Sequence, residues 1–144
     1  MGTRFDDTES RVRSSFARQT MMQTFGAEIA ALAPGRCEIV APVLPLARQQ
    51  HGVGHAGLAF SLGDSAAGYA ALTLMPAEQE VMTAEIKINL LAPAAGDRLI
   101  ARGEVVKAGR RLTVVRADVF AETAGKEKLI AILQGTMVPV AVAG

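Results

Sequence analysis

The feature that most constrains the fold is an apolar segment after His55 in which alanine and glycine occur on every side. Its apolar residues recur at helical spacing, as Leu58, Leu62, Ala66 and Tyr69, with Ala59, Gly63, Ala67 and Ala70 beside them. Small residues all round indicate a helix in close contact with other backbone. Pro76 lies just past its expected end. The rest of the chain must therefore supply a layer against which this helix packs.

Four segments after this helix alternate apolar and polar residues with the period of two that is typical of β-strands. They span residues 81–91, 98–107, 111–121 and 128–140. Links short enough for hairpins favour antiparallel pairing, so these segments predict a four-stranded antiparallel meander. In the first segment the predicted apolar face comprises Met82, Ala84, Ile86, Ile88 and Leu90, and the polar face comprises Thr83, Glu85, Lys87 and Asn89. In the next two, the predicted inner faces are Leu99, Ala101, Gly103 and Val105, and then Thr113, Val115, Ala117 and Val119.

The residues before the buried helix predict a further helix and two further strands. Residues 6–23 have helical spacing, with acidic residues at the N-terminal end and Gly26 as the stop. Residues 27–32 and 36–43 are typical of strands, and Pro34-Gly35 between them is a strong turn signal. The sequence thus predicts an α+β fold in which an antiparallel sheet packs against one long apolar helix, with an N-terminal helix before it.

Composition excludes several classes of function. The 15 Lys and Arg residues nearly cancel the 14 Asp and Glu residues, which argues against a nucleic-acid or anionic-membrane surface. The lone Cys37 excludes an intrachain disulfide framework, and in an apolar strand it is expected to be an inert thiol. Two histidines are too few for most histidine-based metal centres, so no metal is expected. The polar N-terminus does not resemble a signal peptide, and no run is a good transmembrane candidate, so a cytoplasmic protein is expected.

Asp64 is the first candidate for chemistry because it lies about two turns into an otherwise apolar helix. An ionised carboxylate in such surroundings is costly unless it is paired or functional. Two interpretations remain open at this point. Asp64 is either a functional carboxylate or a group that faces a subunit boundary and accepts structural hydrogen bonds.

The start of the same helix is the second candidate. The amides of Ala56 and Gly57 would be its first free donors, and such donors stabilise anions, including the oxyanion of acyl transfer. The alternative is ordinary helix capping. His55 and His51 precede the helix, where a histidine is more often a hydrogen-bonding residue than a catalyst.

A third candidate is a basic cluster, Lys107, Arg110 and Arg111, which flanks a predicted hairpin turn. Its members are either solvated turn residues or a small clamp for the phosphates of a nucleotide.

Residues 49–71 resemble the signature of the PaaI-type hotdog-fold acyl-CoA thioesterases; they read QQHGVGHAGLAFSLGDSAAGYAA. That signature has an Asn or Gln, a glycine-containing loop, His-Gly-Gly, and an Asp or Glu nine residues after the His. Here His55 is the signature histidine, Asp64 follows nine positions later, and Gln49 stands six positions earlier. The similarity continues through residues 83–97 and 105–120 to the last strand, so that it covers about residues 26–140.

The resemblance implies a hotdog fold, an antiparallel sheet wrapped around one long central helix. It implies one such domain over residues 26–144, after an N-terminal helical segment over residues 1–25. It also implies a homodimer or homotetramer with active sites at the dimer interface. The activity implied is acyl-CoA thioester hydrolysis, in which coenzyme A is part of the substrate and no cofactor is needed.

The catalytic roles implied by the resemblance fall on both candidate regions of the long helix. Asp64 is the general base or nucleophile toward the thioester carbonyl. Gln49 and the helix amides of Ala56 and Gly57 come from the partner subunit and polarise that carbonyl. His55 orders the loop.

Further roles implied by the resemblance concern the water and the substrate. Thr83 helps to position water, and Lys107, with Arg110 and Arg111 nearby, contacts coenzyme A. The acyl group would lie in a pocket lined by Leu58, Phe60, Ala67 and Met82.

The chain departs from the signature at one position, since His55-Ala56-Gly57 replaces His-Gly-Gly. Alanine keeps the amide donor if its φ is negative. This departure motivates an alternative function, a non-catalytic acyl-CoA-binding or scaffold protein of the same fold. A related hydratase is disfavoured, because such enzymes pair the Asp with a His a few residues downstream and no His follows Asp64.

Overall fold

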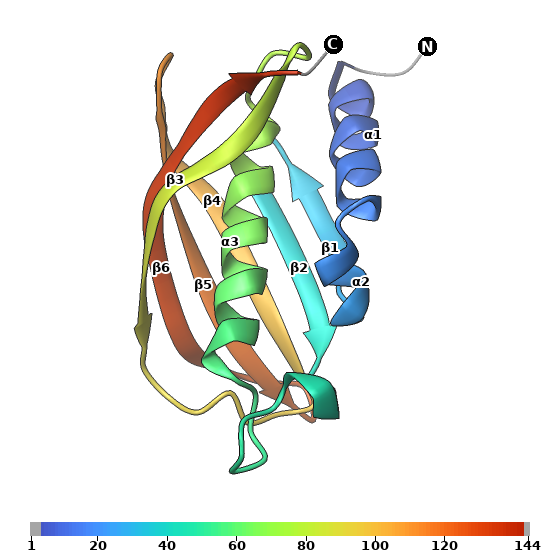
Figure 1. Cartoon of the computed structure of the whole chain (residues 1–144), viewed down its shortest axis with the longest axis vertical. Coiled ribbons are helices and arrows are strands. Elements are labelled where there is room, and N and C mark those ends of the chain that lie inside the picture. Colours follow the sequence, from blue (N-terminus) through green and yellow to red (C-terminus); the bar gives the residue numbers. More distant parts are fainter. Residues whose placement is uncertain (1–3, 143–144) are drawn as a thin grey trace.

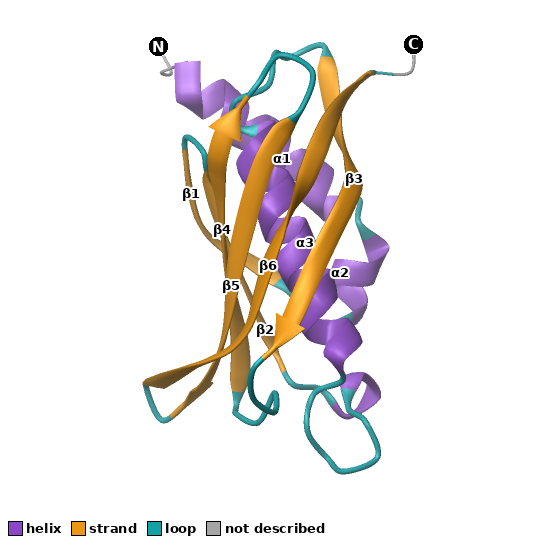
Figure 2. Ribbon diagram, turned by 90° about the vertical axis from the view of Figure 1, so that its left-hand side faces the viewer, coloured by secondary structure: helices purple, strands orange, loops and turns teal. Residues whose placement is uncertain are grey.

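A six-stranded antiparallel sheet curls around one long helix, α3, in the computed structural model, which describes residues 4–142 (Figure 1). The helices are α1 (Arg4–Ala17), α2 (Thr20–Thr24) and α3 (Ala56–Leu72), with a short 3₁₀ turn at Pro45–Ala47. The strands are β1 (Glu28–Ala33), β2 (Arg36–Pro42), β3 (Gln79–Leu90), β4 (Arg98–Ala108), β5 (Thr113–Thr123) and β6 (Lys126–Ala141). Figure 2 shows the two layers, with the sheet on one side and the helices on the other. This is the predicted α+β architecture.

The order of the strands is β1-β2-β4-β5-β6-β3. The predicted four-stranded meander is therefore wrong in its first link, because β3 pairs with β6 rather than with β4. The link after β3 does not form a hairpin. It crosses the end of the sheet beside the loop that precedes α3, where the Gly54 N–H donates to the Ala94 carbonyl. Alternation predicts that a segment is a strand, but it does not name the neighbour of that strand.

The packing of α3 explains why its sequence is built from small residues. Ala59, Ala66 and Ala67 are almost fully buried, and the backbone of the helix lies directly against β4 at Gly103. The predicted inner faces of β4 and β5 are confirmed, since their members are buried or pack against this core. No helix among residues 4–142 is both long enough and apolar enough to cross a membrane.

The predicted apolar face of β3 is corrected by a bulge. The pairing with β6 shifts register between Thr83 and Glu85. Odd-numbered residues therefore face the core before the bulge and even-numbered residues face it after the bulge. Val81 before the bulge and Ile86 after it both pack against the core. Met82, before the bulge, is therefore 57% exposed, whereas Ile86 and Ile88 of the predicted face do pack against the core. Leu90, the last residue of the strand, is 56% exposed although it shares the parity of Ile86.

The predicted N-terminal helix over residues 6–23 is broken into α1 and α2. Gln19 lies between them with an extended backbone, φ −85° and ψ 92°. The break matters because the Gln19 side chain turns toward α3, where it meets Tyr69.

Arg11 ties α1 to the C-terminal end of α3. Its guanidinium donates to the carbonyl oxygens of Leu72, Met75 and Pro76 at 2.8, 2.9 and 2.6 Å. Two of these oxygens also accept a backbone N–H, that of Leu72 from Met75 and that of Pro76 from Gln79. The Arg11 cation offsets the negative end of the helix dipole.

We expect Arg11→Met to lower the free energy of unfolding by about 2 kcal/mol, because it removes a charged donor to three carbonyl oxygens at the negative end of the helix dipole. The measurement is urea unfolding followed by circular dichroism. Arg13→Met is the matched control, since among residues 4–142 Arg13 pairs with Glu9 alone, in an exposed pair of a kind that contributes about 0.5 kcal/mol or less. Equal losses in the two variants would contradict the capping role of Arg11.

Candidate active site

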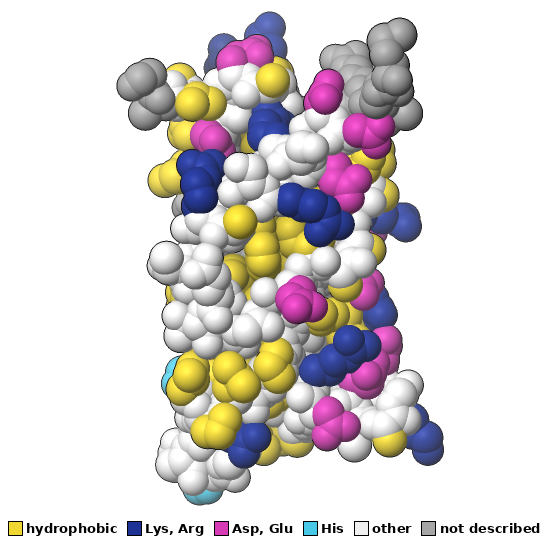
Figure 3. All heavy atoms as spheres, turned by 90° about the vertical axis from the view of Figure 1, so that its right-hand side faces the viewer, with side chains coloured by type: hydrophobic (Ala, Val, Ile, Leu, Met, Phe, Trp, Pro, Cys, Tyr) yellow, Lys and Arg dark blue, Asp and Glu magenta, His cyan; other side chains and the backbone are white. Residues whose placement is uncertain are grey.

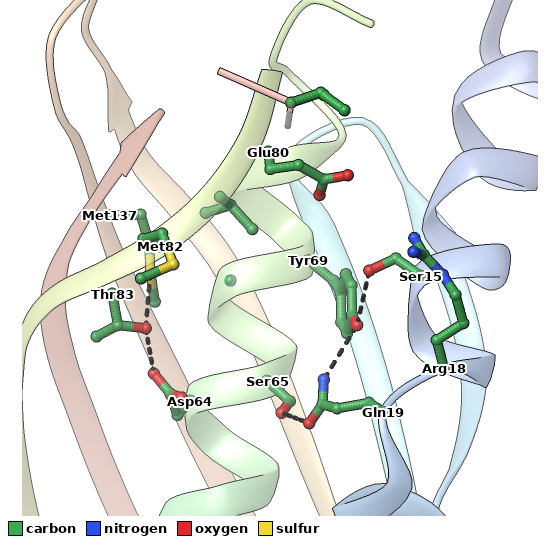
Figure 4. A pocket seen from close by; sticks show the side chains of 13 residues that line it. Ser15, Arg18, Gln19, Asp64, Ser65, Tyr69, Glu80, Met82, Thr83 and Met137 are labelled. Carbon is green, nitrogen blue, oxygen red and sulfur yellow. Dashed lines mark hydrogen bonds between the residues drawn. The ribbon is translucent and has the colours of Figure 1, made fainter. Parts of the chain in front are cut away.

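Asp64 and Thr83 meet at the edge of a cavity of about 690 Å³ between α3, the N-terminal helices and the ends of β3 and β6. The Thr83 hydroxyl donates to Asp64 Oδ1 at 2.7 Å (Figure 4). Alternation had placed Thr83 on the polar outer face of its strand. The bulge after Thr83 turns this residue toward α3, and so the carboxylate of Asp64 gains a hydroxyl partner.

The wall of this cavity opposite β3 is polar and comes from the N-terminal helices. The Gln19 side chain donates to the Tyr69 hydroxyl at 3.0 Å and accepts from the Ser65 hydroxyl at 3.1 Å. Ser15 on α1 lies 3.2 Å from the same Tyr69 oxygen. Nothing in the sequence pattern singled out this network, because it depends on the break at Gln19.

The N-terminal end of α3 is capped by His55. Its Nδ1 accepts the Gly57 N–H at 2.7 Å, so the prediction of a free donor at Gly57 is wrong. A side chain at position 57 would bring its Cβ within 3.0 Å of that nitrogen, which explains the need for glycine there. Within the described chain, the Ala56 N–H has no acceptor, and Ala56 does not have a positive φ. The alanine therefore keeps the amide donor at the start of the helix.

Gln49 lies near Ala56 and away from Asp64. Together with His51, His55 and Ala56 it lines a second cavity, of about 620 Å³, and its side-chain oxygen accepts the His51 N–H. No residue lines both this cavity and the one beside Asp64. The helix rise places Ala56 and Asp64 about 12 Å apart along α3. In one protomer, the structure thus separates the predicted carbonyl-polarising groups from the predicted carboxylate.

The residues predicted to line one acyl pocket do not come together in the protomer. Met82 lines the cavity beside Asp64, whereas Leu58 and Phe60 line a third cavity of about 310 Å³. Ala67 is fully buried in the core and lines neither. Exposed apolar side chains gather around the third cavity, toward the lower end of the face in Figure 3, and include Met21 and Leu46.

The basic cluster lies at the other end of the molecule from His55. Lys107, Arg110 and Arg111 are exposed on and beside the turn between β4 and β5. The base of that hairpin is tied to the C-terminal end of α3 through Gly35, which accepts the Val105 N–H and donates to Thr73 Oγ1. Its role as a phosphate clamp stays a prediction.

Cys37 and metal binding complete the set of candidates. Burial raises the pKa of the Cys37 thiol to about 12, and the side chain is 2% exposed, which confirms an inert buried thiol. In the part of the chain that the structure describes, no three His, Cys, Asp or Glu side chains converge to hold a metal ion.

Comparison with known proteins decides the family. The family model described as the thioesterase superfamily matches residues 51–128, more than half of the chain. The chain belongs to the thioesterase superfamily. The comparison with curated proteins returns no match.

Solved structures agree with this membership. A thioesterase family protein from Silicibacter pomeroyi is 46% identical, with a TM-score of 0.92 over 94% of this chain and 99% of that one. The PaaI protein of Escherichia coli, from the phenylacetic acid degradation operon, is 20% identical, with a TM-score of 0.85 over 99% and 98%. A thioesterase from Haemophilus influenzae is 22% identical, with a TM-score of 0.81 over 90% and 89%. The last two show the fold alone. This thioesterase superfamily member has the predicted PaaI-type hotdog fold and is a thioester hydrolase.

Proposed function

We propose that this thioesterase superfamily member hydrolyses acyl-CoA thioesters at a site shared between two protomers, with Asp64 as the general base or nucleophile. One observation carries the proposal. A carboxylate in the middle of an apolar helix lines a cavity with a hydroxyl partner, while Ala56, whose amide has no acceptor in the described chain, lines a different cavity. A second protomer that brings the N-terminus of its α3 to Asp64 would place the carboxylate and the amide donor in one active site.

The chemistry follows from the charges that develop in acyl transfer. Asp64 accepts a proton from water as the water oxygen attacks the thioester carbonyl carbon. The carbonyl oxygen then becomes an oxyanion, which the Ala56 amide and the Gln49 side chain of the partner subunit stabilise. The tetrahedral intermediate collapses by breaking the C–S bond, and the departing thiolate takes up the proton. Thr83 holds Asp64 Oδ1 in place and leaves Oδ2 for the water.

The proposed dimer joins the β3 edges of two sheets. Within the described sheet β3 is an edge strand of 12 residues, with the backbone groups of one side unpaired. Exposed Met82 and Leu90 add apolar area along it. A long edge with unpaired backbone groups is a good surface for pairing with a second copy.

The basic cluster of the β4–β5 hairpin is the proposed contact for coenzyme A. Lys107, Arg110 and Arg111 are exposed, and an ammonium with two guanidinium groups suits the phosphates of the nucleotide. The alternative of a non-catalytic acyl-CoA binder rested on Ala56. Because the Ala56 amide is kept and free, that alanine does not favour the alternative.

Ala56→Pro tests the oxyanion donor without unfolding the helix. Proline is favoured at the first position of a helix, and the His55 backbone (φ −64°, ψ 146°) already suits the residue before a proline. The substitution replaces the amide hydrogen with the ring Cδ, and we expect kcat for acyl-CoA hydrolysis to fall about 10²-fold to 10³-fold. Ala56→Ser keeps the N–H and is the matched control. Unchanged kcat in a folded Ala56→Pro variant would contradict the proposed donor.

Mixing two inactive variants tests whether the site is shared. In a hybrid of Asp64→Asn and Ala56→Pro protomers, one shared site carries both lesions and the other carries none. Random mixing after joint refolding should therefore restore about a quarter of the wild-type activity. A mixture that stays as inactive as its components, although hybrid dimers form, would show that Asp64 and Ala56 act within one protomer.

A further inference from the structure

The cavity beside Asp64 has two walls of opposite character. The wall on the strand side is mainly apolar, with Val81, Met82 and Met137, and also carries Thr83 and Glu80 of β3. The wall on the side of the N-terminal helices carries the hydroxyls and amide of Ser15, Gln19 and Tyr69, and the guanidinium of Arg18. Figure 4 shows the side chains of the second wall, Ser15, Arg18, Gln19 and Tyr69, along one side of the cavity, and Asp64 and Thr83 on the other.

The hydroxyl of Tyr69 is held in place rather than free to move. Gln19 donates to it, Ser15 lies within hydrogen-bond distance of it, and the tyrosine side chain is only 5% exposed. The Phe16 ring packs edge-on against the Tyr69 ring at 6.0 Å between centroids. The polar wall is therefore preorganised, so hydrogen bonds to a ligand form there with little loss of side-chain entropy.

Arg18 adds the positive charge of the wall. Its Nε makes a long hydrogen bond to the Ser14 carbonyl at 3.4 Å. Of the described residues, none places a carboxylate within ion-pair distance of Arg18. Its two terminal nitrogens lie in the fork geometry that suits a carboxylate or another acceptor oxygen.

The floor of the cavity leaves room for an acyl group. Gly68 lies one helical turn after Asp64, and a Cβ added there would meet only the Met137 side chain, at 3.8 Å. The thioethers of Met82 and Met137 are flexible and adapt to the shape of a ligand. A saturated chain that filled the cavity would nevertheless cover the Arg18 guanidinium without giving its terminal nitrogens an acceptor, which is costly.

We infer that the acyl group of the substrate is compact and carries an oxygen at its far end, which hydrogen-bonds to Arg18 and Tyr69. This inference rests on the proposed function, because it places the thioester carbonyl beside Asp64 and the rest of the acyl group along α3. Glu80, on β3, also lines the cavity. The negative charge of Glu80 favours an acyl group that ends in a hydroxyl, whereas the positive charge of Arg18 favours one that ends in a carboxylate. The test therefore compares acyl groups with these two ends.

Three substrates of equal carbon number make the comparison: adipyl-CoA, 6-hydroxyhexanoyl-CoA and hexanoyl-CoA. Coenzyme A release is measured for each with the wild-type chain and with Asp64→Asn. We expect at least one oxygen-ended substrate to exceed hexanoyl-CoA in kcat/KM by about tenfold, as one added hydrogen bond supplies. A kcat/KM for hexanoyl-CoA equal to or above both others would overturn the inference.

Variants at the wall separate this inference from the proposed function. Arg18→Gln should lower the ratio of adipyl-CoA to hexanoyl-CoA turnover, and Tyr69→Phe should lower the ratio of 6-hydroxyhexanoyl-CoA to hexanoyl-CoA turnover, each about tenfold. Arg13→Gln, on α1 and outside the cavity, should leave both ratios unchanged. Hydrolysis that depends on Asp64 but shows no such preference would refute the inference alone. Absence of Asp64-dependent hydrolysis with any acyl-CoA would refute the proposed function.

Discussion

Asp64→Asn is expected to lower kcat for acyl-CoA hydrolysis by about 10³-fold or more while the fold stays intact. The amide has nearly the shape of the carboxylate, and its oxygen still accepts the hydrogen bond from Thr83. It can neither take a proton from water nor attack the carbonyl carbon. The loss therefore appears in kcat, and urea unfolding should show little change because Asp64 is only half-buried.

Thr83→Val separates the positioning of the Asp64 carboxylate from its chemical role. Valine removes the hydroxyl that holds Asp64 Oδ1 and keeps the carboxylate itself. We expect a smaller fall in kcat, about tenfold, since only the positioning of the base is lost. An Asp64→Asn variant with wild-type kcat, measured by thiol release with the best substrate, would remove Asp64 from the mechanism.

Gly103→Ala is expected to lower the free energy of unfolding by about 3 kcal/mol or more. A Cβ on Gly103 would lie 2.3 Å from the carbonyl carbon of Ala66 and 2.4 Å from its oxygen. Both are backbone atoms of α3, so no side-chain rotation relieves the clash, and the helix must move away from β4. Because α3 carries both Asp64 and Ala56, activity should fall together with stability.

Gly68→Ala is the matched control for this effect, since it is also a glycine-to-alanine change beside the core. The nearest atom to its new Cβ is 3.8 Å away and belongs to a flexible methionine. Helix propensity alone predicts a gain of up to about 1 kcal/mol. Equal behaviour of the two variants in urea unfolding would show that α3 does not lie as close to β4 as the structure places it.

Local sequence chemistry predicted the layers of this protein and the part of the site that lies on one element. Alternation along β4 and β5 predicted their inner faces, because the period of side-chain direction in a strand does not depend on its partner. The small residues of α3 predicted a buried helix, because only they allow backbone to approach that closely. The spacing of His55 and Asp64 lies within one helix and its cap, and so it was visible in the chain.

Contacts between distant segments set the features that no single element shows. The bulge in β3 turned Thr83 toward Asp64. The alternation of apolar and polar residues does not predict this bulge, because it arises from the pairing of β3 with β6. Only the folded chain shows that His55 occupies the Gly57 amide and that Gln19 breaks the N-terminal helix to hold Tyr69. The order of residues along the chain shows which groups are available for thioester chemistry. The packing of distant segments determined which of them face the same cavity, because contact across a sheet and a helix is set by pairing register and not by position along the chain.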